Sequence, residues 1–278
     1  MVVIMQLAAF QGDRHLALDF VPVSTAVQPR KVIRSQAQLC PKIEVAKLRE
    51  RRVLMSQYKE DEKLLNWFNG LCGGTYIELG GLTGKEFSNT YVFNKAFQWA
   101  GVLIEPSPVN FEKLTQNRPS QYELATVNAA VCKEEQDIHF YVKPGMGAVN
   151  GIWEFTDATR RLKAWPGATL ADTTLLKCKP FMDILDDNLG YSDEHFFDIL
   201  SLDIEGAELS ALLSLDFDRV DFGVIVVENR IFHPRNYWAV RTLIESKGYI
   251  FIENEDKNDW FIHGQFYEIY EGLTADEA

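Results

Sequence analysis

The fold is decided by the stretch Thr75-Tyr76-Ile77-Glu78-Leu79-Gly80-Gly81-Leu82-Thr83-Gly84. It has the pattern of a buried strand that ends in a glycine-rich turn and leads on to a helix. Glycine has no β-carbon, so its backbone can approach a ligand closely. In open α/β sheets, ligands bind at the carboxyl ends of the strands, where such a turn lies. The stretch therefore predicts a parallel sheet with a ligand held over residues 78–84.

Further short apolar runs follow this turn and alternate with helix-like stretches. The runs cover residues 102–104, 125–131, 196–202 and 222–227, and the helix-like stretches cover residues 207–213 and 237–247. This alternation is typical of βαβ units on a parallel sheet. The near-continuous hydrophobicity of the runs indicates that helices cover both faces of the sheet.

The last two apolar runs, residues 249–252 and 260–262, are separated only by a short polar stretch. A crossover helix does not fit into such a gap, so we expect an antiparallel hairpin at the edge of the sheet. Together the runs predict an α/β fold: a doubly wound, mostly parallel, seven-stranded sheet with an antiparallel C-terminal hairpin.

The chain divides into an extension, a lead-in and a main domain. Residues 1–42 lack sustained periodicity and are expected to be a variable or loosely ordered extension, whereas residues 43–72 have the spacing of a helical lead-in. The main domain is predicted over residues 73–270. Within it, residues 143–179 are rich in glycine and proline and are expected to form an irregular insertion, of the kind that often acts as a lid.

The charge of the chain argues against several classes of partner. Its 28 Lys and Arg residues against 40 Asp and Glu give a formal net charge of -12, which repels a phosphate backbone, so no nucleic-acid partner is expected. The apolar start of the chain is about half as long as a spanning helix, so no membrane span is expected.

The four cysteines, Cys40, Cys72, Cys132 and Cys178, form no C-x-x-C pair and have no histidine at zinc spacing. We therefore expect buried free thiols in a reducing compartment, without a disulfide framework or a metal knuckle. The cytoplasm is taken as the default location. Organellar targeting by residues 1–40 stays open, because that stretch carries basic residues, although Asp13 and Asp19 argue against a transit peptide.

Two carboxylates at predicted strand ends suggest a nucleoside site. Glu78 ends the first run and Glu105 ends the second, where a carboxylate can accept hydrogen bonds from both hydroxyls of a ribose. The glycine positions do not fit the G-x-G-x-x-G pattern of a dinucleotide site. A pyrophosphate would also meet the charge of Glu78, whereas S-adenosylmethionine carries positive charge that an acidic loop favours. A strand-to-helix turn with a purely structural acid is the alternative.

The sequence resembles the FkbM-like methyltransferases over roughly residues 56–263. The matching stretches are Ser56-Gln57, Glu60-Asp61, Gly74-Thr75-Tyr76-Ile77-Glu78-Leu79-Gly80-Gly81, Ser88-Asn89-Thr90, Gly101-Val102-Leu103-Ile104-Glu105-Pro106-Ser107-Pro108, Asn128-Ala129-Ala130-Val131, Asp198-Ile199-Leu200-Ser201-Leu202-Asp203-Ile204-Glu205-Gly206-Ala207-Glu208 and Val226-Val227-Glu228. The resemblance implies a class I, Rossmann-like methyltransferase fold. It also implies methyl transfer from S-adenosylmethionine, typically to a hydroxyl oxygen of a small molecule or sugar. One departure is that Gly81-Leu82-Thr83-Gly84 lacks the acid that the family often has there.

The expected cofactor-binding residues lie at the ends of the predicted strands and just beyond them. They are Glu78, Gly80, Gly81, Gly84, Asn89, Glu105, Pro106, Asn128, Ala129 and Asp203. Asn128 is expected to form a hydrogen bond near the adenine ring, with a turn-stabilising role as the alternative.

Methyl transfer to a hydroxyl needs alignment of the reacting atoms and a group that takes the hydroxyl proton. The candidate bases are Asp203, Glu205, Glu228 and His233. Glu208 follows closely, but acids in a first helical turn also stabilise that turn, so it is assigned to the helix start. No metal is expected, although the pattern does not separate carboxylates that bind Mg²⁺ through water from those that bind ligand hydroxyls.

Two other functions remain open. One is a non-catalytic interaction module that keeps the S-adenosylmethionine-binding fold, and the other is a nicotinamide oxidoreductase, which the glycine spacing disfavours. The partner expected for the enzyme is a small-molecule or sugar acceptor, and the oligomeric state is not predicted.

Overall fold

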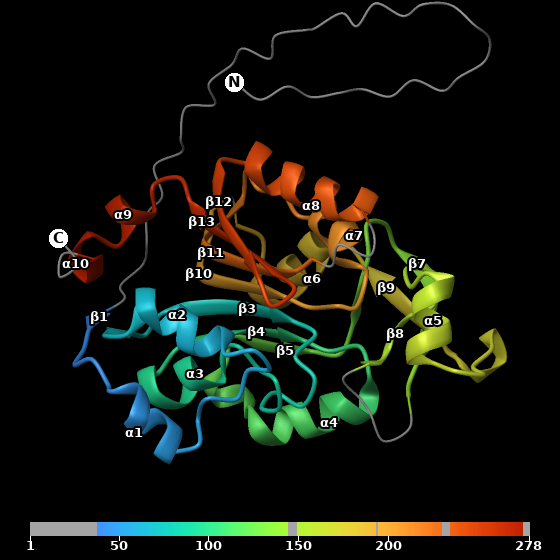
Figure 1. Ribbon diagram of the computed structural model, residues 1–278, viewed down its shortest axis with the longest axis horizontal. Helices are drawn as coiled ribbons and strands as arrows, with labels where there is room; N and C mark the ends of the chain where they lie inside the picture. Colours follow the sequence, from blue (N-terminus) through green and yellow to red (C-terminus); the bar gives the residue numbers. More distant parts are fainter. Residues whose placement is uncertain (1–37, 144–148, 193, 230–233, 275–278) are drawn as a thin grey trace, which may run out of the picture. The chain divides into compact units, whose positions relative to one another are not determined.

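The computed structural model describes residues 38–143, 149–192, 194–229 and 234–274 (Figure 1). Most of the predicted N-terminal extension and the candidate base His233 lie outside these residues. Among the described helices, none combines the length and the apolar character needed to span a bilayer.

A seven-stranded sheet forms the centre of the fold, in the order β12-β13-β11-β10-β3-β4-β5. Its strands are β3 (Thr75–Leu79), β4 (Ala100–Ile104), β5 (Ala125–Val127), β10 (His195–Leu202), β11 (Val220–Glu228), β12 (Tyr249–Glu255) and β13 (Asn258–His263). Strands β5, β4, β3, β10 and β11 pair in parallel, and the hairpin β12–β13 joins β11 in antiparallel fashion. The predicted doubly wound fold with an antiparallel C-terminal hairpin is confirmed.

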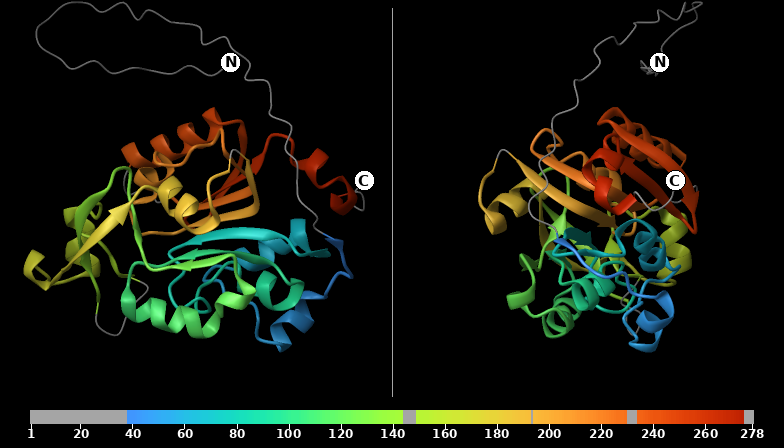
Figure 2. Two further views of the ribbon diagram at one scale, coloured as in Figure 1. Left: turned by 180° about the vertical axis from the view of Figure 1, so that it is seen from behind. Right: turned by 90° about the vertical axis from the view of Figure 1, so that its left-hand side faces the viewer.

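Helices cover both faces of this sheet, as the two views of Figure 2 show. One face packs against α6 (Phe181–Leu189), α7 (Glu208–Leu212) and α8 (Pro234–Ser246); the other packs against α2 (Glu60–Phe68), α3 (Tyr91–Phe97), α4 (Pro108–Asn117) and α9 (Phe266–Ile269). Successive side chains of a strand point to opposite faces, so Ile77 joins the first apolar core and Tyr76 joins the second. This two-sided burial explains the near-continuous hydrophobicity of the strands. Short helices α10 (Glu271–Thr274) and η1 (Ser120–Tyr122) lie at the chain end and before β5.

The lead-in contains two helices, α1 (Val45–Glu50) and α2, where the sequence suggested one helical segment. The backbone turns between them, with left-handed φ values of 54° at Arg52 and 68° at Lys59. Asp61 stabilises this turn, because its carboxylate accepts hydrogen bonds from the Met55 and Ser56 amides at 2.6 and 3.1 Å. The pair Ser56 and Asp61 therefore orders the entry to α2.

Residues 149–179 of the expected irregular insertion contain two strands and two short helices, and these strands pair with strands that precede the insertion. A second sheet has the order β6-β9-β7-β8. Its strands are β6 (Ala130–Val131), β7 (Gln136–Tyr141), β8 (Gly151–Ile152) and β9 (Thr174–Lys179), with α5 (Ala158–Ala164) and η3 (Leu170–Asp172) between β8 and β9. We call this four-stranded unit the small sheet. The two-residue strands β6 and β8 carry no readable alternation, so the sequence pattern could not reveal them.

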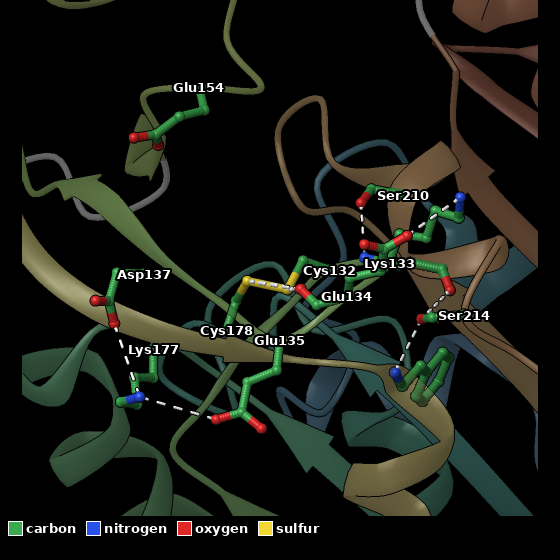
Figure 3. Close-up of a disulfide and its surroundings, with 12 residues drawn as sticks. Cys132, Lys133, Glu134, Glu135, Asp137, Glu154, Lys177, Cys178, Ser210 and Ser214 are labelled. Atoms are coloured by element: carbon green, nitrogen blue, oxygen red, sulfur yellow. Dashed lines mark hydrogen bonds and ion pairs between the residues drawn. A yellow bond between two sulfur atoms is a disulfide. The ribbon is translucent and has the colours of Figure 1, made fainter.

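Two disulfides correct the prediction of four free thiols. Cys40 pairs with Cys72 beside the short ladder of β1 (Gln38–Leu39) and β2 (Leu71–Cys72), and Cys132 pairs with Cys178 in the small sheet (Figure 3). The Cα atoms lie 5.8 and 5.7 Å apart, within the range that a disulfide needs. Such proximity arises from tertiary pairing, which cysteine spacing in the sequence does not show.

The disulfides also remove the argument for a reducing compartment. That expectation rested on free thiols, and within the described residues all four cysteines are paired. Disulfides form and persist mainly in oxidising environments such as the secretory pathway. The cytoplasmic prediction therefore loses its basis.

Candidate functional site

A cavity of about 300 Å³ lies at the carboxyl ends of β3, β4, β10 and β11. The small sheet and the turn of the β12–β13 hairpin complete its wall. The sequence-predicted residues that line it are Glu78, Gly80, Asn89, Glu105, Pro106, Ala129, Asp203, Glu205 and Glu228. Gly81, Gly84 and Asn128 are not among its lining residues, and His233 lies outside the described chain. The structure thus brings together most of the predicted site.

Gly80 lets two strand ends meet at the floor of the cavity. Its φ is +79°, and a β-carbon there would overlap the backbone carbonyl oxygen of Asp203. The amide of Gly80 donates to Ile104 O at 3.0 Å, and the amide of Asp203 donates to Leu79 O at 3.2 Å. Only glycine fits this position, because both the conformation and the close approach exclude a side chain.

Gly81 and Gly84 pack the loop against α4 and do not line the cavity. The Gly84 amide donates to Gly81 O at 2.6 Å, and an added β-carbon on Gly84 would lie 2.8 Å from Cγ of Arg118. These two glycines therefore shape the loop, and Gly80 is the one that opens onto the cavity.

Glu78 is buried and orders the segment that follows the loop. Its carboxylate accepts hydrogen bonds from Ser88 Oγ at 2.8 Å, the Asn89 amide at 2.8 Å and Thr90 Oγ1 at 2.6 Å. Burial raises the pKa of Glu78, while the charge of Arg118 and these three donors oppose that rise. Glu78 lines the cavity, and its hydrogen bonds hold the chain that leads into α3.

A buried hydrogen-bond network around Arg118 connects to Glu78 through Thr90. Arg118 is fully buried and donates from Nε to Glu123 at 2.7 Å and from Nη2 to Tyr76 at 2.6 Å and to Thr90 at 3.0 Å. Burial raises the pKa of Tyr76 well above its usual value. Since Thr90 also binds Glu78, this network fixes the position of the loop.

Glu105 lies buried at the tip of β4. One carboxylate oxygen accepts from the Leu82 amide at 2.9 Å, and the other accepts from the Ser107 amide at 2.9 Å and Asn110 Nδ2 at 3.4 Å. Burial raises the pKa of Glu105 to about 7, against the effect of these donors. The oxygen that accepts only from the Leu82 amide can accept a further hydrogen bond from a ligand.

Asn128 stabilises the backbone at Glu105 and Pro106 through its side-chain amide. Its Nδ2 donates to Glu105 O at 2.7 Å and to Pro106 O at 3.2 Å. These bonds correspond to the turn-stabilising alternative, while its neighbour Ala129 lines the cavity.

Three carboxylates meet where β10 and β11 end. Oxygen atoms of Asp203, Glu208 and Glu228 lie within 4.8 Å of one another. Glu208 Oε1 accepts from the Ile204 amide at 3.1 Å and the Gly206 amide at 3.0 Å, which agrees with its assignment to the helix start. Burial, followed by the charge of Glu228, raises the pKa of Glu208 to about 7. Asp203 is the exposed member of the three and lines the cavity.

Glu205 has a different environment from its neighbours. Its φ is +60°, and its carboxylate forms an ion pair with Arg160 of α5. The ion pair connects the segment after β10 to the insertion. The carboxylate of Glu205 is therefore paired with a cation from the insertion.

Sequence reasoning named no individual site residue in the wall that comes from the insertion, the lead-in and the hairpin turn. Asn150, Tyr58 and Lys257 line the cavity. Lys257 donates to the hydroxyl of Tyr58, and Asn258 Nδ2 donates to Glu60 Oε1 at 2.9 Å, so the hairpin turn is bound to the lead-in. The motifs of the parallel sheet carry no signal for these residues.

Unusual backbone conformations concentrate around the cavity. The non-glycine residues with left-handed φ that line it are Leu82, Phe87, Glu205, Asp256 and Lys257. Such conformations cost free energy and cluster at binding and catalytic sites.

A family model described as a methyltransferase FkbM domain matches residues 73–251, more than half of the chain. No curated protein matches. Among solved structures, the chain is similar to methyltransferase FkbM from Methylobacillus flagellatus KT, with 13% identity and a TM-score of 0.40, over 68% of this chain and 43% of that one. The chain thus spans less than half the length of that protein.

Two further solved structures are similar at comparable levels. A TehB-like SAM-dependent methyltransferase from Corynebacterium glutamicum ATCC 13032 Kitasato has 10% identity and a TM-score of 0.35, over 79% of this chain and 95% of that one. A putative sarcosine dimethylglycine methyltransferase from Galdieria sulphuraria has 11% identity and a TM-score of 0.30, over 75% of this chain and 60% of that one.

The matched range, residues 73–251, contains the glycine loop, Glu105 and the acids that follow β10. It also contains every strand of the small sheet. The chain belongs to the FkbM methyltransferase family.

Proposed function

We propose that the protein transfers a methyl group from S-adenosylmethionine to a hydroxyl oxygen of a small molecule or sugar. One observation carries the proposal: Gly80, Glu105 and Asp203, from three neighbouring strands, line one cavity. The carboxyl ends of the strands are where open α/β sheets bind ligands.

The charge of the cavity fits this cofactor. Acids predominate among the charged residues that line the cavity in the described part of the chain, and Lys257 is the one basic residue of that set. S-adenosylmethionine supplies a methyl group on a positively charged sulfur, and a cation is stabilised by nearby carboxylates. Gly80 adds a surface without a side chain, against which a ligand can lie close to the backbone.

Glu105 is the residue proposed to hold the ribose. Its ionised carboxylate accepts hydroxyl donors, and the Leu82 and Ser107 amides fix its orientation. Hydrogen bonds to charged groups contribute about 1.5–3 kcal/mol each. Pro106 and Ala129, which lie beside it in the wall, supply apolar surface for a base.

Asp203 is the proposed base for the acceptor hydroxyl. It is exposed and lines the cavity, whereas Glu228 is buried. A carboxylate that takes a proton during attack contributes about 10²- to 10⁴-fold to the rate.

A non-catalytic binding module is the second candidate, and the acids at the strand ends speak against it. Asp203 and Glu228 both line the cavity beyond Glu105, and a module that binds the cofactor without transferring its methyl group does not need a base there.

Thermal shift with S-adenosylhomocysteine, next to NAD, tests the cofactor. Stabilisation by S-adenosylhomocysteine alone supports the proposal, and stabilisation by NAD alone overturns it. Labelled-methyl transfer from S-adenosylmethionine to small-molecule pools then tests catalysis. Binding of S-adenosylhomocysteine without transfer to any pool or cell extract would favour the non-catalytic module.

A further inference from the structure

We infer that Asn150 is a specificity-determining residue that recognises an oxygen of the methyl acceptor next to the hydroxyl that is methylated. The inference deepens the proposed function and rests on it. It assigns the acceptor to neutral compounds with neighbouring oxygens, in preference to anions and amines.

The starting observation is a buried donor without a partner. Asn150 is 7% exposed and lines the cavity, and its Nδ2 has no hydrogen-bond acceptor among the residues that the structure describes. A buried donor left unpaired costs free energy, so native structures nearly always satisfy such groups. The missing partner is therefore expected to come from a ligand.

The orientation of this amide is settled by its other half. Asn150 Oδ1 accepts a hydrogen bond from the Lys143 amide at 2.9 Å. An exchange of oxygen and nitrogen would set an NH₂ group against that N–H, so the nitrogen must be the group without a partner. Asn150 therefore offers a donor and requires an acceptor oxygen.

The backbone around Asn150 is held in place. Trp165 donates from its indole nitrogen to Val149 O at 2.6 Å, and the next residue, Gly151, pairs with Tyr141 of β7. An added β-carbon on Gly151 would lie 3.1 Å from the Trp165 ring. The amide is thus presented from a fixed wall, which is the condition for selecting among ligands.

The small sheet packs directly onto the proposed catalytic segment. Ile152 shares an apolar cluster with Ala207, and Ile204 packs against the same cluster. The ion pair between Arg160 and Glu205 adds a polar connection between the two. Asn150 and Asp203 therefore line one cavity from two walls that are in contact.

The wall that carries Asp203 selects hydrogen-bond donors of the acceptor molecule, and the wall that carries Asn150 selects an acceptor oxygen of the same molecule. Asp203 and Glu228 accept hydrogen bonds from hydroxyls, and Asn150 Nδ2 donates to an oxygen that lies beside them. An anionic acceptor is repelled by the acids, which predominate among the charged residues of the cavity wall. An ammonium group satisfies the acids but leaves the Asn150 donor unpaired, and a site rejects a ligand that leaves its buried polar groups unpaired.

Three matched pools of acceptors test this assignment. The pools hold neutral sugars and polyols, the corresponding sugar acids and the corresponding amino sugars, each with labelled S-adenosylmethionine. The wild-type protein is expected to label the neutral pool at least about tenfold faster than the other two, the discrimination that one unpaired buried group gives.

Asn150→Asp is the most informative variant. It keeps the oxygen that accepts from the Lys143 amide and replaces the NH₂ donor with a carboxylate oxygen. We expect its KM for the best neutral acceptor to rise about tenfold and its relative rate with amino sugars to increase. Its kcat, its affinity for S-adenosylhomocysteine and its melting temperature should stay near wild type. Asn150→Ala should lose the neutral preference without a gain for amino sugars.

Asn69→Asp is the matched control. Asn69 also holds a backbone amide with its oxygen, but its Nδ2 is paired with Ile43 O at 2.9 Å, and it does not line the cavity. This control should lower the melting temperature and leave the acceptor preference unchanged.

Three results would overturn the inference. They are an Asn150→Asp protein with unchanged KM and preference, faster labelling of the acid or amine pool by the wild type, and no labelling of any pool while S-adenosylhomocysteine binds. Failure of S-adenosylhomocysteine to bind the wild type is a different result and removes the proposed function itself.

Discussion

A β-carbon at Gly80 would overlap the backbone carbonyl oxygen of Asp203. The glycine loop and the proposed catalytic strand are therefore in direct backbone contact at the floor of the cavity. Gly80→Ala is expected to lower the free energy of unfolding by more than about 3 kcal/mol and to abolish binding of S-adenosylhomocysteine, because both the left-handed φ and the overlap oppose a side chain. Chemical denaturation and calorimetry measure the two effects.

Gly73→Ala is the control for that substitution. Gly73 has a φ of +65°, but an added β-carbon there meets no atom within 4 Å. Gly73→Ala should lower the free energy of unfolding by only about 1 kcal/mol and leave ligand binding intact. Equal effects at the two glycines would show that backbone conformation alone, and not contact with Asp203, determines the cost.

Binding of S-adenosylhomocysteine should strengthen as the pH rises from 6 to 8. The pKa of Glu105 is raised to about 7 by burial, so at pH 6 its carboxyl is mostly protonated in the free protein. Ribose hydroxyls donate to the ionised form, and binding below the pKa must expel a proton. Glu105→Gln should weaken binding by about 1.5–3 kcal/mol at pH 8 and remove most of the pH dependence.

Calorimetry at several pH values, with Glu112→Gln as the control, checks this expectation. Glu112 is exposed on α4 and does not line the cavity. An unchanged affinity in Glu105→Gln would exclude Glu105 from the ribose site.

Asp203→Asn should reduce turnover by about 10²- to 10⁴-fold and change cofactor affinity little, if Asp203 takes the proton of the acceptor hydroxyl. Asparagine keeps the shape of the side chain and lacks its basicity. Rate measurements with an identified acceptor, together with calorimetry, separate the roles. A parallel fall of rate and affinity would place Asp203 at the cofactor, and near wild-type turnover would rule out a catalytic role.

The stability of the protein should decrease as the pH rises from about 4.5 to 7, in part because of Glu208. Its pKa is raised from 4.5 to about 7 by burial and by Glu228. In this window the folded protein holds a proton that the unfolded chain has released, so the free energy of unfolding falls with rising pH. Glu208→Gln removes this contribution and keeps an oxygen for the Ile204 and Gly206 amides.

Melting curves at pH 5 and pH 8 test the effect. The variant should be more stable than wild type by about 1–3 kcal/mol at pH 8 and similar to it at pH 5. Glu245→Gln, an exposed acid of α8, should show no such difference. A variant that is equally destabilised at both pH values would mean that packing, and not charge, dominates at this position.

Removal of the Cys132–Cys178 disulfide should destabilise the protein by about 2–4 kcal/mol, since the bridge closes a long loop. The bridge joins β6 to β9, and β6 lines the cavity. Replacement of both cysteines by alanine should therefore increase hydrogen exchange in residues 136–143 and 149–152. Removal of Cys40–Cys72 is the matched control, which should give a similar loss of stability with exchange increased near β1 and β2. Exchange that does not differ between the two variants would contradict this local role.

The sequence by itself determined the sheet and one side of the site. The apolar runs are nearly continuous because helices bury both faces, and Gly80, Glu105 and Asp203 each follow a strand, so a local pattern places them at one edge. Only the tertiary structure decided the rest. The small sheet is built from strands as short as Gly151–Ile152, which carry no readable period, and its pairing brings Cys132 to Cys178 and Asn150 to the cavity. Those contacts join residues far apart in the chain, and no local spacing encodes them.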